Sequence, residues 1–199
     1  MNKVQLSEIN NLVEYEKVRD RMLAEIIELK KRRRVPLGDN LTLLFENRET
    51  VLFQIHEMVR TERIVDAAKI QDEIDAYDAL LPEASQFSAT LFIEIPGIAV
   101  MSPEQVRVAV NRFQGIEAGC LFLELGTHRV PARFEGGHTK EEKLAGVQYL
   151  RFAITPEAQR ALADPAEPVH LVVDHPRYKA KREIASEVRE ELLRDLAQA

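Results

Sequence analysis

The sequence predicts an α+β fold in which a long N-terminal helix and a unit of one β-hairpin and two helices pack on a mixed β-sheet. Three observations predict this class. Apolar side chains recur at helical spacing in the first 34 residues, the stretch 41–81 begins as a short apolar strand and continues as two amphipathic helices, and strands alternate with helices from Ser88 onward. Because two of those alternations are strand-helix-strand crossovers, we expect a split sheet similar to the ferredoxin-like arrangement, with an extra strand.

The chain of 199 residues has the length of one large domain or two small ones. Loop-like composition over residues 82–87 marks the clearest internal boundary. We therefore expect a mostly helical part over residues 1–85, which contains the hairpin, and an α+β part over residues 86–199. The two parts are expected to fold together as one globular domain.

The first long helix is predicted from residue 8 to about residue 34, with a joint near residues 10–11. It ends in the basic run Lys30–Arg34, which has two interpretations. It is either a patch for nucleic acid or lipid, or a cationic last turn that complements the helix dipole. The negative net charge of the chain favours the second. The apolar arc of this helix consists of Leu12, Tyr15, Val18, Met22, Leu23, Ile26, Ile27 and Leu29.

Val35–Leu37 is predicted as an edge strand, because Pro36 cannot donate a backbone hydrogen bond to a neighbouring strand. It forms a hairpin with the apolar strand Leu41–Phe45. Asn47 suits the N-cap position of the next helix, and Asp66 suits that of the helix after it. These two helices are predicted from residue 48 and over residues 67–81.

Cap signals and apolar runs predict the elements of the C-terminal half. Ser102, Pro103 and Gln105 together are typical of a helix start, and Thr155 precedes a second one. Residues 135–146 contain paired glycines and dense charge, so we expect a mobile loop. The predicted strands are 88–95, 120–125, 128–134, 147–155 and 168–174, and the predicted helices are 102–113, 156–163 and 184–197.

The helix after Asn47 is apolar on two faces. Its main stripe faces the core, while Phe53 and Ile64 project from roughly the opposite side. Either two layers of the fold cover this helix, which we expect, or Phe53 and Ile64 contact a partner. In the second case the candidate interaction surface consists of Phe53, His56, Arg60 and Ile64.

Arg19 and Glu62 each lie near the middle of an otherwise apolar helix face, where an unpaired charge is costly. We therefore predict that they form a buried or half-buried ion pair, with Glu16 accepting a second bond from the arginine. The alternative is that Glu62 lies beyond the last helical turn and that Arg19 reaches water. A polar site around Arg19, Glu46 and Glu62 would lie between the two long helices and the sheet.

Signatures of known catalytic and nucleotide-binding sites are absent from the sequence, so we predict no catalytic residues, no metal and no cofactor. His170 and Asp174 lie on the same side of the final predicted strand, with His175 next to them. These three residues are a weak candidate site for a metal or an anion. Cys120, the only cysteine, lies in an apolar strand, where a thiol is usually inert packing.

The formal net charge of −6 argues against a nucleic-acid partner. Neither a membrane-spanning apolar run nor a signal-peptide pattern is found. We therefore expect a cytoplasmic protein without nucleic-acid or membrane partners, for which self-association stays open.

One group of segments carries a family resemblance: Lys30 with Arg34–Gly38, Leu41–Arg48, Phe53–Ile55, Glu57–Arg60, Asp174–Tyr178 and Asp195–Leu196. These segments resemble an uncharacterised bacterial family catalogued as domain of unknown function 3501. The resemblance covers essentially the whole chain and implies no activity. Genes of this family lie beside genes for rubrerythrin-like and iron–sulfur oxidoreductase-like proteins, so the resemblance implies a link to redox or oxidative-stress physiology. At His56 the family is expected to have glutamine, which weakens a metal role there.

Two classes of function follow from these observations. The first hypothesis is a non-catalytic accessory protein that contacts a redox protein partner. The alternative is a small-molecule or metal-dependent enzyme with a polar site around Arg19, Glu46 and Glu62.

Overall fold

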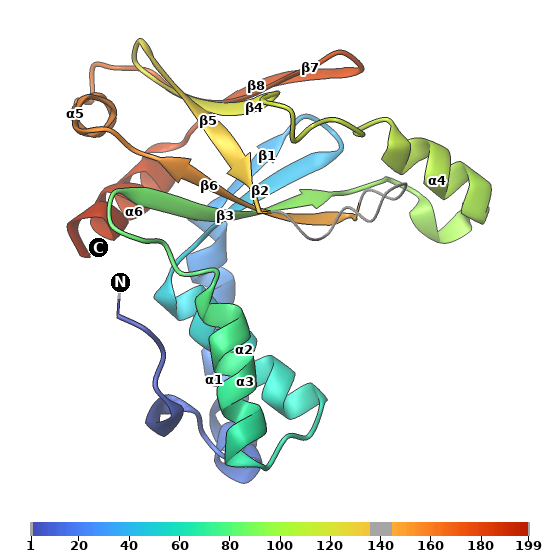
Figure 1. The fold of residues 1–199 in the computed structure, drawn as a ribbon, viewed down its shortest axis with the longest axis vertical. Helices are drawn as coiled ribbons and strands as arrows, with labels where there is room; N and C mark the ends of the chain where they lie inside the picture. The colour runs from blue at the N-terminus through green and yellow to red at the C-terminus, as the bar shows by residue number, and fades with distance from the viewer. Residues whose placement is uncertain (1, 136–144, 199) are drawn as a thin grey trace.

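The computed structural model describes residues 2–135 and 145–198, in which eight strands form one antiparallel sheet that curls into a nearly closed barrel (Figure 1). The strand order is β1-β2-β3-β6-β5-β4-β7-β8. Most of the predicted mobile loop, residues 136–144, lies outside the described residues. The strands are β1 Arg34–Leu37, β2 Leu41–Glu46, β3 Gln86–Ile93, β4 Leu121–Leu125, β5 His128–Phe134, β6 Val147–Ala153, β7 Val169–His175 and β8 Tyr178–Glu183. The α-helices are α1 Leu12–Lys31, α2 Arg48–Thr61, α3 Ala67–Asp78, α4 Pro103–Asn111, α5 Pro156–Ala163 and α6 Ser186–Gln198, and the 3-10 turns are η1 Leu6–Glu8 and η2 Ile98–Val100.

The predicted mixed, ferredoxin-like sheet is wrong, although the long N-terminal helix and the hairpin with its two helices are present. All seven pairings between neighbouring strands are antiparallel. A split strand-helix-strand unit needs parallel strands. Both expected crossovers instead join antiparallel strands that have two other strands between them: β3 continues through α4 to β4, and β6 through α5 to β7. The alternation of elements along the sequence does not reveal which strands are neighbours.

The strand β8 is absent from the sequence-based expectation. Its sequence is YKAKRE, and most of its side chains are exposed. Tyr178 and Ala180 are the members that pack against the core. A strand at the end of the sheet order needs few apolar side chains, so this segment carries little of the pattern by which strands are predicted.

Alternate residues of the strands fill the barrel with one apolar core. From β2, Leu41, Leu43 and Phe45 point inward, and Phe45 meets the edge of Phe87 from β3 at 5.9 Å between ring centroids. Strands from both predicted parts of the chain, 1–85 and 86–199, contribute to this core, because β2 pairs with β3 along its whole length.

Tyr178 closes the barrel at one end of the seam between β1 and β8. Its hydroxyl donates to the carbonyl of Leu37 at 2.8 Å and accepts from the backbone N–H of Asn40 at 3.2 Å. Gly38 turns the hairpin with a φ of 69°, and a Cβ at that position would clash with the tyrosine hydroxyl. The two edge strands are therefore joined through a side chain.

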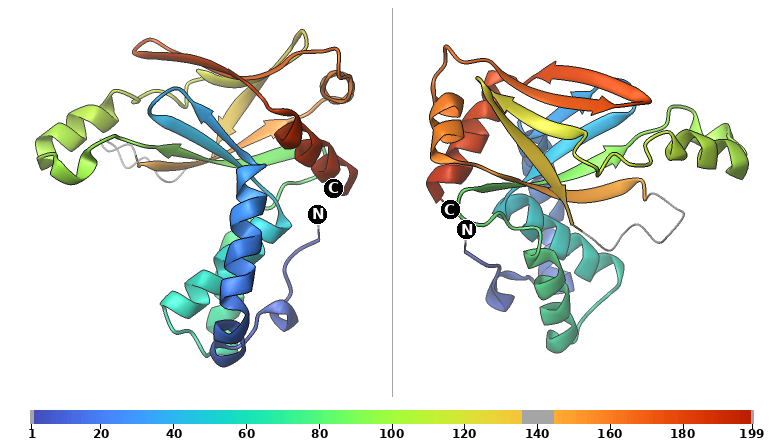
Figure 2. Two further views of the ribbon diagram at one scale, coloured as in Figure 1. Left: turned by 180° about the vertical axis from the view of Figure 1, so that it is seen from behind. Right: turned by 45° about the horizontal axis from the view of Figure 1, so that its top comes forward.

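The helices α1, α2 and α3 form an arm that extends from one side of the barrel, and α4 projects in a different direction (Figures 1 and 2). The arm has its own apolar core, to which Val51, Ile55 and Val59 of α2 contribute. The predicted caps are confirmed: the side chains of Asn47 and Asp66 accept backbone N–H groups at the starts of α2 and α3. No helix within the described ranges is long and apolar enough to span a lipid bilayer.

Arg33 anchors the C-terminal helix α6 to the barrel. Its fully buried guanidinium donates to the carbonyls of Phe45 and Glu46 and pairs with Glu191 and Asp195 of α6. The side chains of the basic run Lys30–Arg34 therefore lie in different environments. Arg33 faces the interior, whereas Lys31 is exposed and pairs with Glu28.

Candidate functional site

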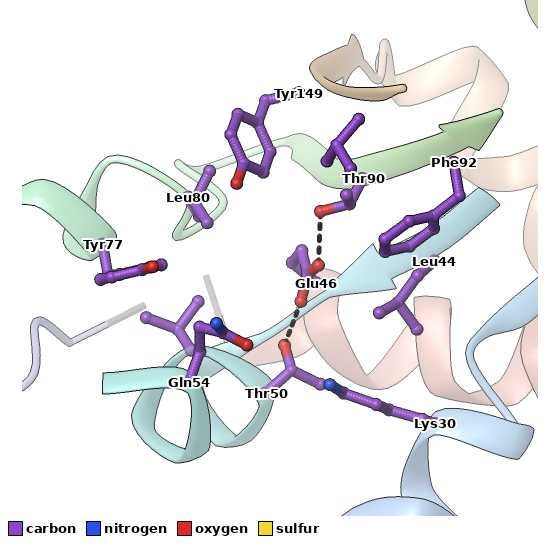
Figure 3. Close-up of a pocket in the computed structure, with 12 residues that line it drawn as sticks. Lys30, Leu44, Glu46, Thr50, Gln54, Tyr77, Leu80, Thr90, Phe92 and Tyr149 are labelled. Carbon is purple, nitrogen blue, oxygen red and sulfur yellow. Dashed lines mark hydrogen bonds between the residues drawn. The ribbon is translucent and has the colours of Figure 1, made fainter. Parts of the chain in front are cut away.

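A cavity of about 230 Å³ lies between the outer face of the sheet and the helical arm (Figure 3). Strands β2, β3 and β6 supply its floor, α2 and the end of α3 supply one wall, and the last turn of α1 reaches its rim. Its polar lining residues are Lys30, Glu46, Thr50, Gln54, Tyr77, Thr90 and Tyr149. Its apolar lining residues are Leu44, Val51, Leu80, Phe92 and Val147.

The strand register builds the floor of this pocket. Leu44, Thr90 and Tyr149 are directly opposite one another across β2, β3 and β6, so they form one row on the outer face. Phe92 and Val147 form part of the next row. Successive residues of a strand point to opposite faces, so the neighbours of these residues point into the barrel core instead.

Glu46 is the buried acid of the pocket, with only 9% of its surface exposed. Its two carboxylate oxygens accept hydrogen bonds from the hydroxyls of Thr50 at 2.5 Å and Thr90 at 2.6 Å. The residue is the last of β2 and directly precedes the N-cap of α2. Arg33 donates to the carbonyl of Glu46 and so fixes the backbone that carries this side chain.

Tyr77 and Tyr149 approach the pocket from α3 and β6 (Figure 3). Burial raises the pKa of Tyr149, and the neighbouring Tyr77 and Glu46 raise it further. Its phenol therefore stays protonated at neutral pH and can donate a hydrogen bond. The amide of Gln54 lies on the α2 side of the same cavity and offers both a donor and an acceptor.

Arg151 holds the wall contributed by α3 against the sheet. Its guanidinium donates to the carbonyls of Ala79 and Leu81 and pairs with Glu135 at 2.7 Å. The sequence predicts a helix up to residue 81, but α3 ends at Asp78. A charged side chain from a distant strand binds the carbonyls that follow the helix, so these residues leave the helical path.

Arg19 pairs with Glu57, so the predicted ion pair between Arg19 and Glu62 is wrong. The guanidinium Nε and Nη2 of Arg19 each lie 2.8 Å from one oxygen of Glu57, and the hydroxyl of Tyr15 donates to the same carboxylate. Arg19 lowers the pKa of Glu57 from its ordinary value. Glu62 is the exposed C-cap of α2, because that helix ends at Thr61.

The other members of the predicted polar site lie apart from one another. Glu16 pairs with Arg60 at 2.8 Å on the outer side of the helical arm, so it is not the second acceptor of Arg19. Glu46 is the one residue of the predicted set that lines the pocket.

The candidate interaction surface is largely covered by the chain itself. Phe53 is buried, and the Nζ of Lys30 lies 5.8 Å from its ring centroid. Ile64 is half-buried against the apolar core of the arm, and Arg60 is half-buried and paired with Glu16. Within the described residues, these side chains do not form a continuous exposed patch.

His56 of α2 is buried against the N-terminal segment of the chain. Its ring stacks on Tyr15 at 4.7 Å between centroids. The partners of its two nitrogens assign the tautomer: Nδ1–H donates to the carbonyl of Leu52 at 2.9 Å, and Nε2 accepts from the backbone N–H of Asn10 at 3.1 Å. Burial lowers the pKa of His56. Both nitrogens are used within the chain, so this residue is a packing group.

The three residues of the weak candidate ligand site lie on two faces of β7. Asp174 is exposed and pairs with Lys179 at 2.7 Å, and His170 shares its face. His175 is buried on the opposite face, where its Nε2 contacts the carbonyl of Gln114 at 3.0 Å. No group of three or more histidine, cysteine or acidic side chains that could hold a metal ion occurs in the part of the chain that the structure describes.

Most of the pocket was not predicted from the sequence. Lys30 was assigned to a basic run, Tyr77 to a helix, and Thr90 and Tyr149 to strands. The signal in the sequence was Thr90, a polar residue inside the apolar run of its strand. That signal indicates a polar environment on one face of the sheet, but it does not show that the three strands are neighbours.

Comparisons with known proteins give a consistent result. A family model described as "Protein of unknown function (DUF3501)" matches residues 3–196. A crystal structure described as a novel protein of unknown function from Burkholderia pseudomallei K96243 has 34% sequence identity and a TM-score of 0.86, and the match covers 98% of this chain and 100% of that one. No curated protein matches the sequence.

Proposed function

Because the chain belongs to the DUF3501 family of proteins of unknown function, we propose a function from the pocket itself: the protein binds a small molecule, and Glu46 is the group that anchors it. The observation that carries this proposal is a buried carboxylate at the wall of a cavity. A carboxylate removed from water needs hydrogen-bond donors or a positive charge. Two threonine hydroxyls bind it, whereas an ionised carboxylate can accept about four hydrogen bonds.

The size and lining of the pocket restrict the ligand. Its volume of about 230 Å³ is below the range of roughly 300–1,000 Å³ that is common for drug-sized ligands, so the ligand is smaller than these. Side chains of Leu44, Leu80, Phe92 and Val147 supply apolar contact, and the hydroxyls of Thr50 and Thr90 lie on Glu46. Polar groups placed beside apolar side chains in one concavity are typical of sites that orient a small molecule.

A thermal-shift screen tests the proposal. The full-length protein is mixed with a library of small neutral, cationic, anionic and zwitterionic compounds. A ligand present at about 100 times its Kd stabilises a protein by about 2.7 kcal/mol, which raises the Tm of a chain of this length by about 5–10 °C. Gln54→Trp, which fills the pocket from α2, is expected to abolish that rise. Gln159→Trp makes the same change at an exposed position of α5 and is expected to keep it.

Two outcomes contradict the proposal. One is that no compound of the library raises the Tm of the wild-type protein. The other is that every stabilising compound acts equally on the Gln54→Trp variant, which would place binding elsewhere.

The accessory-protein hypothesis stays a prediction with less structural support. It depends on the resemblance and on an outward apolar face of α2, and Phe53 of that face is buried within the chain. Co-purification of the native protein with a tagged rubrerythrin-like or iron–sulfur oxidoreductase-like protein checks it directly. The pocket is the feature that the geometry supports best.

A further inference from the structure

The pocket carries charges of opposite sign at one end. Glu46 lies at the junction of β2 and α2, and Lys30 reaches the same region from the last turn of α1. Figure 3 shows the Lys30 amine and the Glu46 carboxylate on either side of Thr50. Among the described residues, neither side chain forms a salt bridge within 4.0 Å.

The neighbours of Lys30 in the basic run form ion pairs within the chain. Lys31 pairs with Glu28, Arg32 with Glu191 and Arg33 with Asp195, all within the chain. Lys30 is half-buried and contacts the ring of Phe53. A half-buried ammonium and a buried carboxylate that do not pair with each other are both available to a ligand that carries the opposite charges.

Apolar side chains also line the cavity beyond this charged end. Leu44 and Phe92 line the sheet side, Leu80 follows α3, and Val147 begins β6. A ligand that pairs with Glu46 and Lys30 and also fills the apolar part of the cavity has an ammonium group and an acid group close together and a compact apolar substituent.

We propose, building on the proposed small-molecule function, that the ligand is a zwitterion of the amino-acid class. Its ammonium group hydrogen-bonds Glu46, and its acid group binds Lys30. Its apolar side chain lies against Leu44, Leu80 and Phe92. The amide of Gln54, which lines the same cavity, supplies further hydrogen bonds to the two charged groups.

Calorimetric titration of the full-length protein with matched compounds tests this inference. Leucine carries both charges, 3-methylbutylamine keeps the amine alone, and 4-methylpentanoate keeps the acid alone. Phenylalanine, phenethylamine and 3-phenylpropanoate form a second series with a larger side chain. In at least one series the amino acid is expected to bind at least tenfold more tightly than either of its singly charged relatives.

Three variants assign the two charges. Glu46→Gln is expected to weaken the amino acid at least tenfold and to leave the acid unchanged. Lys30→Met is expected to weaken the amino acid at least tenfold and to leave the amine unchanged. Lys31→Met, which removes the next lysine of α1, is expected to bind like the wild-type protein. Circular dichroism and Tm confirm that each variant is folded, and the wild-type series decides the question without any variant.

The outcomes separate this inference from the proposed function. The inference is wrong if an amine binds as tightly as the corresponding amino acid. It is also wrong if Lys30→Met does not change the affinity for the amino acid, because Lys30 then does not bind the acid group of the ligand. If neither amino acid binds while another compound of the screen occupies the pocket, the inference is again wrong and the proposed function stands. If no compound binds the pocket at all, both are wrong.

Discussion

Arg19 of α1 and Glu57 of α2 form a two-bond ion pair that joins the two long helices of the arm, with both N···O distances at 2.8 Å. The pair is about three-quarters buried, and Tyr15 adds a third hydrogen bond to the carboxylate. Paired hydrogen bonds between a guanidinium and a carboxylate are stronger than single exposed ion pairs. We therefore expect this pair to contribute to the stability of the arm.

Substitution of Glu57 by glutamine is expected to lower the Tm by about 2–4 °C, because it removes a charge that three donors share. Glu25→Gln is the matched control, since Glu25 forms an exposed pair with Arg21 on α1. That control is expected to shift the Tm by less than about 1 °C. Equal Tm values for the two variants would show that the Arg19 pair has no special role.

His56 makes the stability of the fold dependent on pH. Burial lowers its pKa in the folded protein, while the unfolded chain has an ordinary value of about 6.5. Below about pH 6.5 the unfolded chain therefore takes up a proton that the folded protein does not, so stability falls as pH falls. The slope for one such group is at most about 1.4 kcal/mol per pH unit, down to the folded pKa.

His56→Gln is expected to remove this contribution, since glutamine does not titrate. Urea unfolding of both proteins at pH 7.5, 6.5 and 5.5 measures it, and all other groups are common to the two chains. The difference in unfolding free energy is expected to shift in favour of the variant as the pH is lowered. Parallel pH profiles would contradict the assigned role of His56.

Substitution of Arg33 is expected to lower the free energy of unfolding strongly. Its removal leaves Asp195 buried without its partner, takes one of three cationic partners from Glu191 and releases the carbonyls of Phe45 and Glu46. Loss of one member of a buried ion pair typically costs about 3–5 kcal/mol, so Arg33→Met is expected to destabilise by about that amount. Lys31→Met, two residues earlier and exposed, is expected to change stability by less than about 0.5 kcal/mol. Chemical denaturation of both variants measures the contrast, and similar losses would refute it.

Tyr178→Phe tests how the barrel is closed. The change removes a hydroxyl that bonds the carbonyl of Leu37 and the N–H of Asn40, and it keeps the ring in the core. It is expected to cost about 1–2 kcal/mol and to speed hydrogen exchange at the Asn40 amide more than at amides of the central strand β6. Unchanged exchange at Asn40 would show that the seam is held in another way.

Local structure was largely predictable from the sequence because its signals are local. The caps at Asn47, Asp66, Ser102 and Thr155 are confirmed, as are the edge strand at Pro36 and the hairpin that it forms with the next strand. The sheet order was not predictable, because neighbouring strands such as β3 and β6 are separated by a long stretch of chain. The wrong partner for Arg19 has a local cause: the predicted helix includes Ile64, but the helix ends at Thr61 and the left-handed φ of 54° at Arg63 turns the chain away.

The pocket could be predicted only in part for the same reason. Glu46 belongs to the polar site that was predicted between the two long helices and the sheet. Thr90 and Tyr149 join it through the register of three strands, and Tyr77 joins it through Arg151, which binds the residues after α3. These are relations between distant segments, which periodicity and composition do not contain.

A crystal structure of the full-length protein with the compound that raises its Tm most shows directly whether the pocket binds a small molecule. Electron density for that compound is expected in the cavity between β2, β3, β6 and α2, with a donor group within hydrogen-bond distance of the Glu46 carboxylate. Density for the compound at any other place on the protein, with this cavity holding only water, would contradict it.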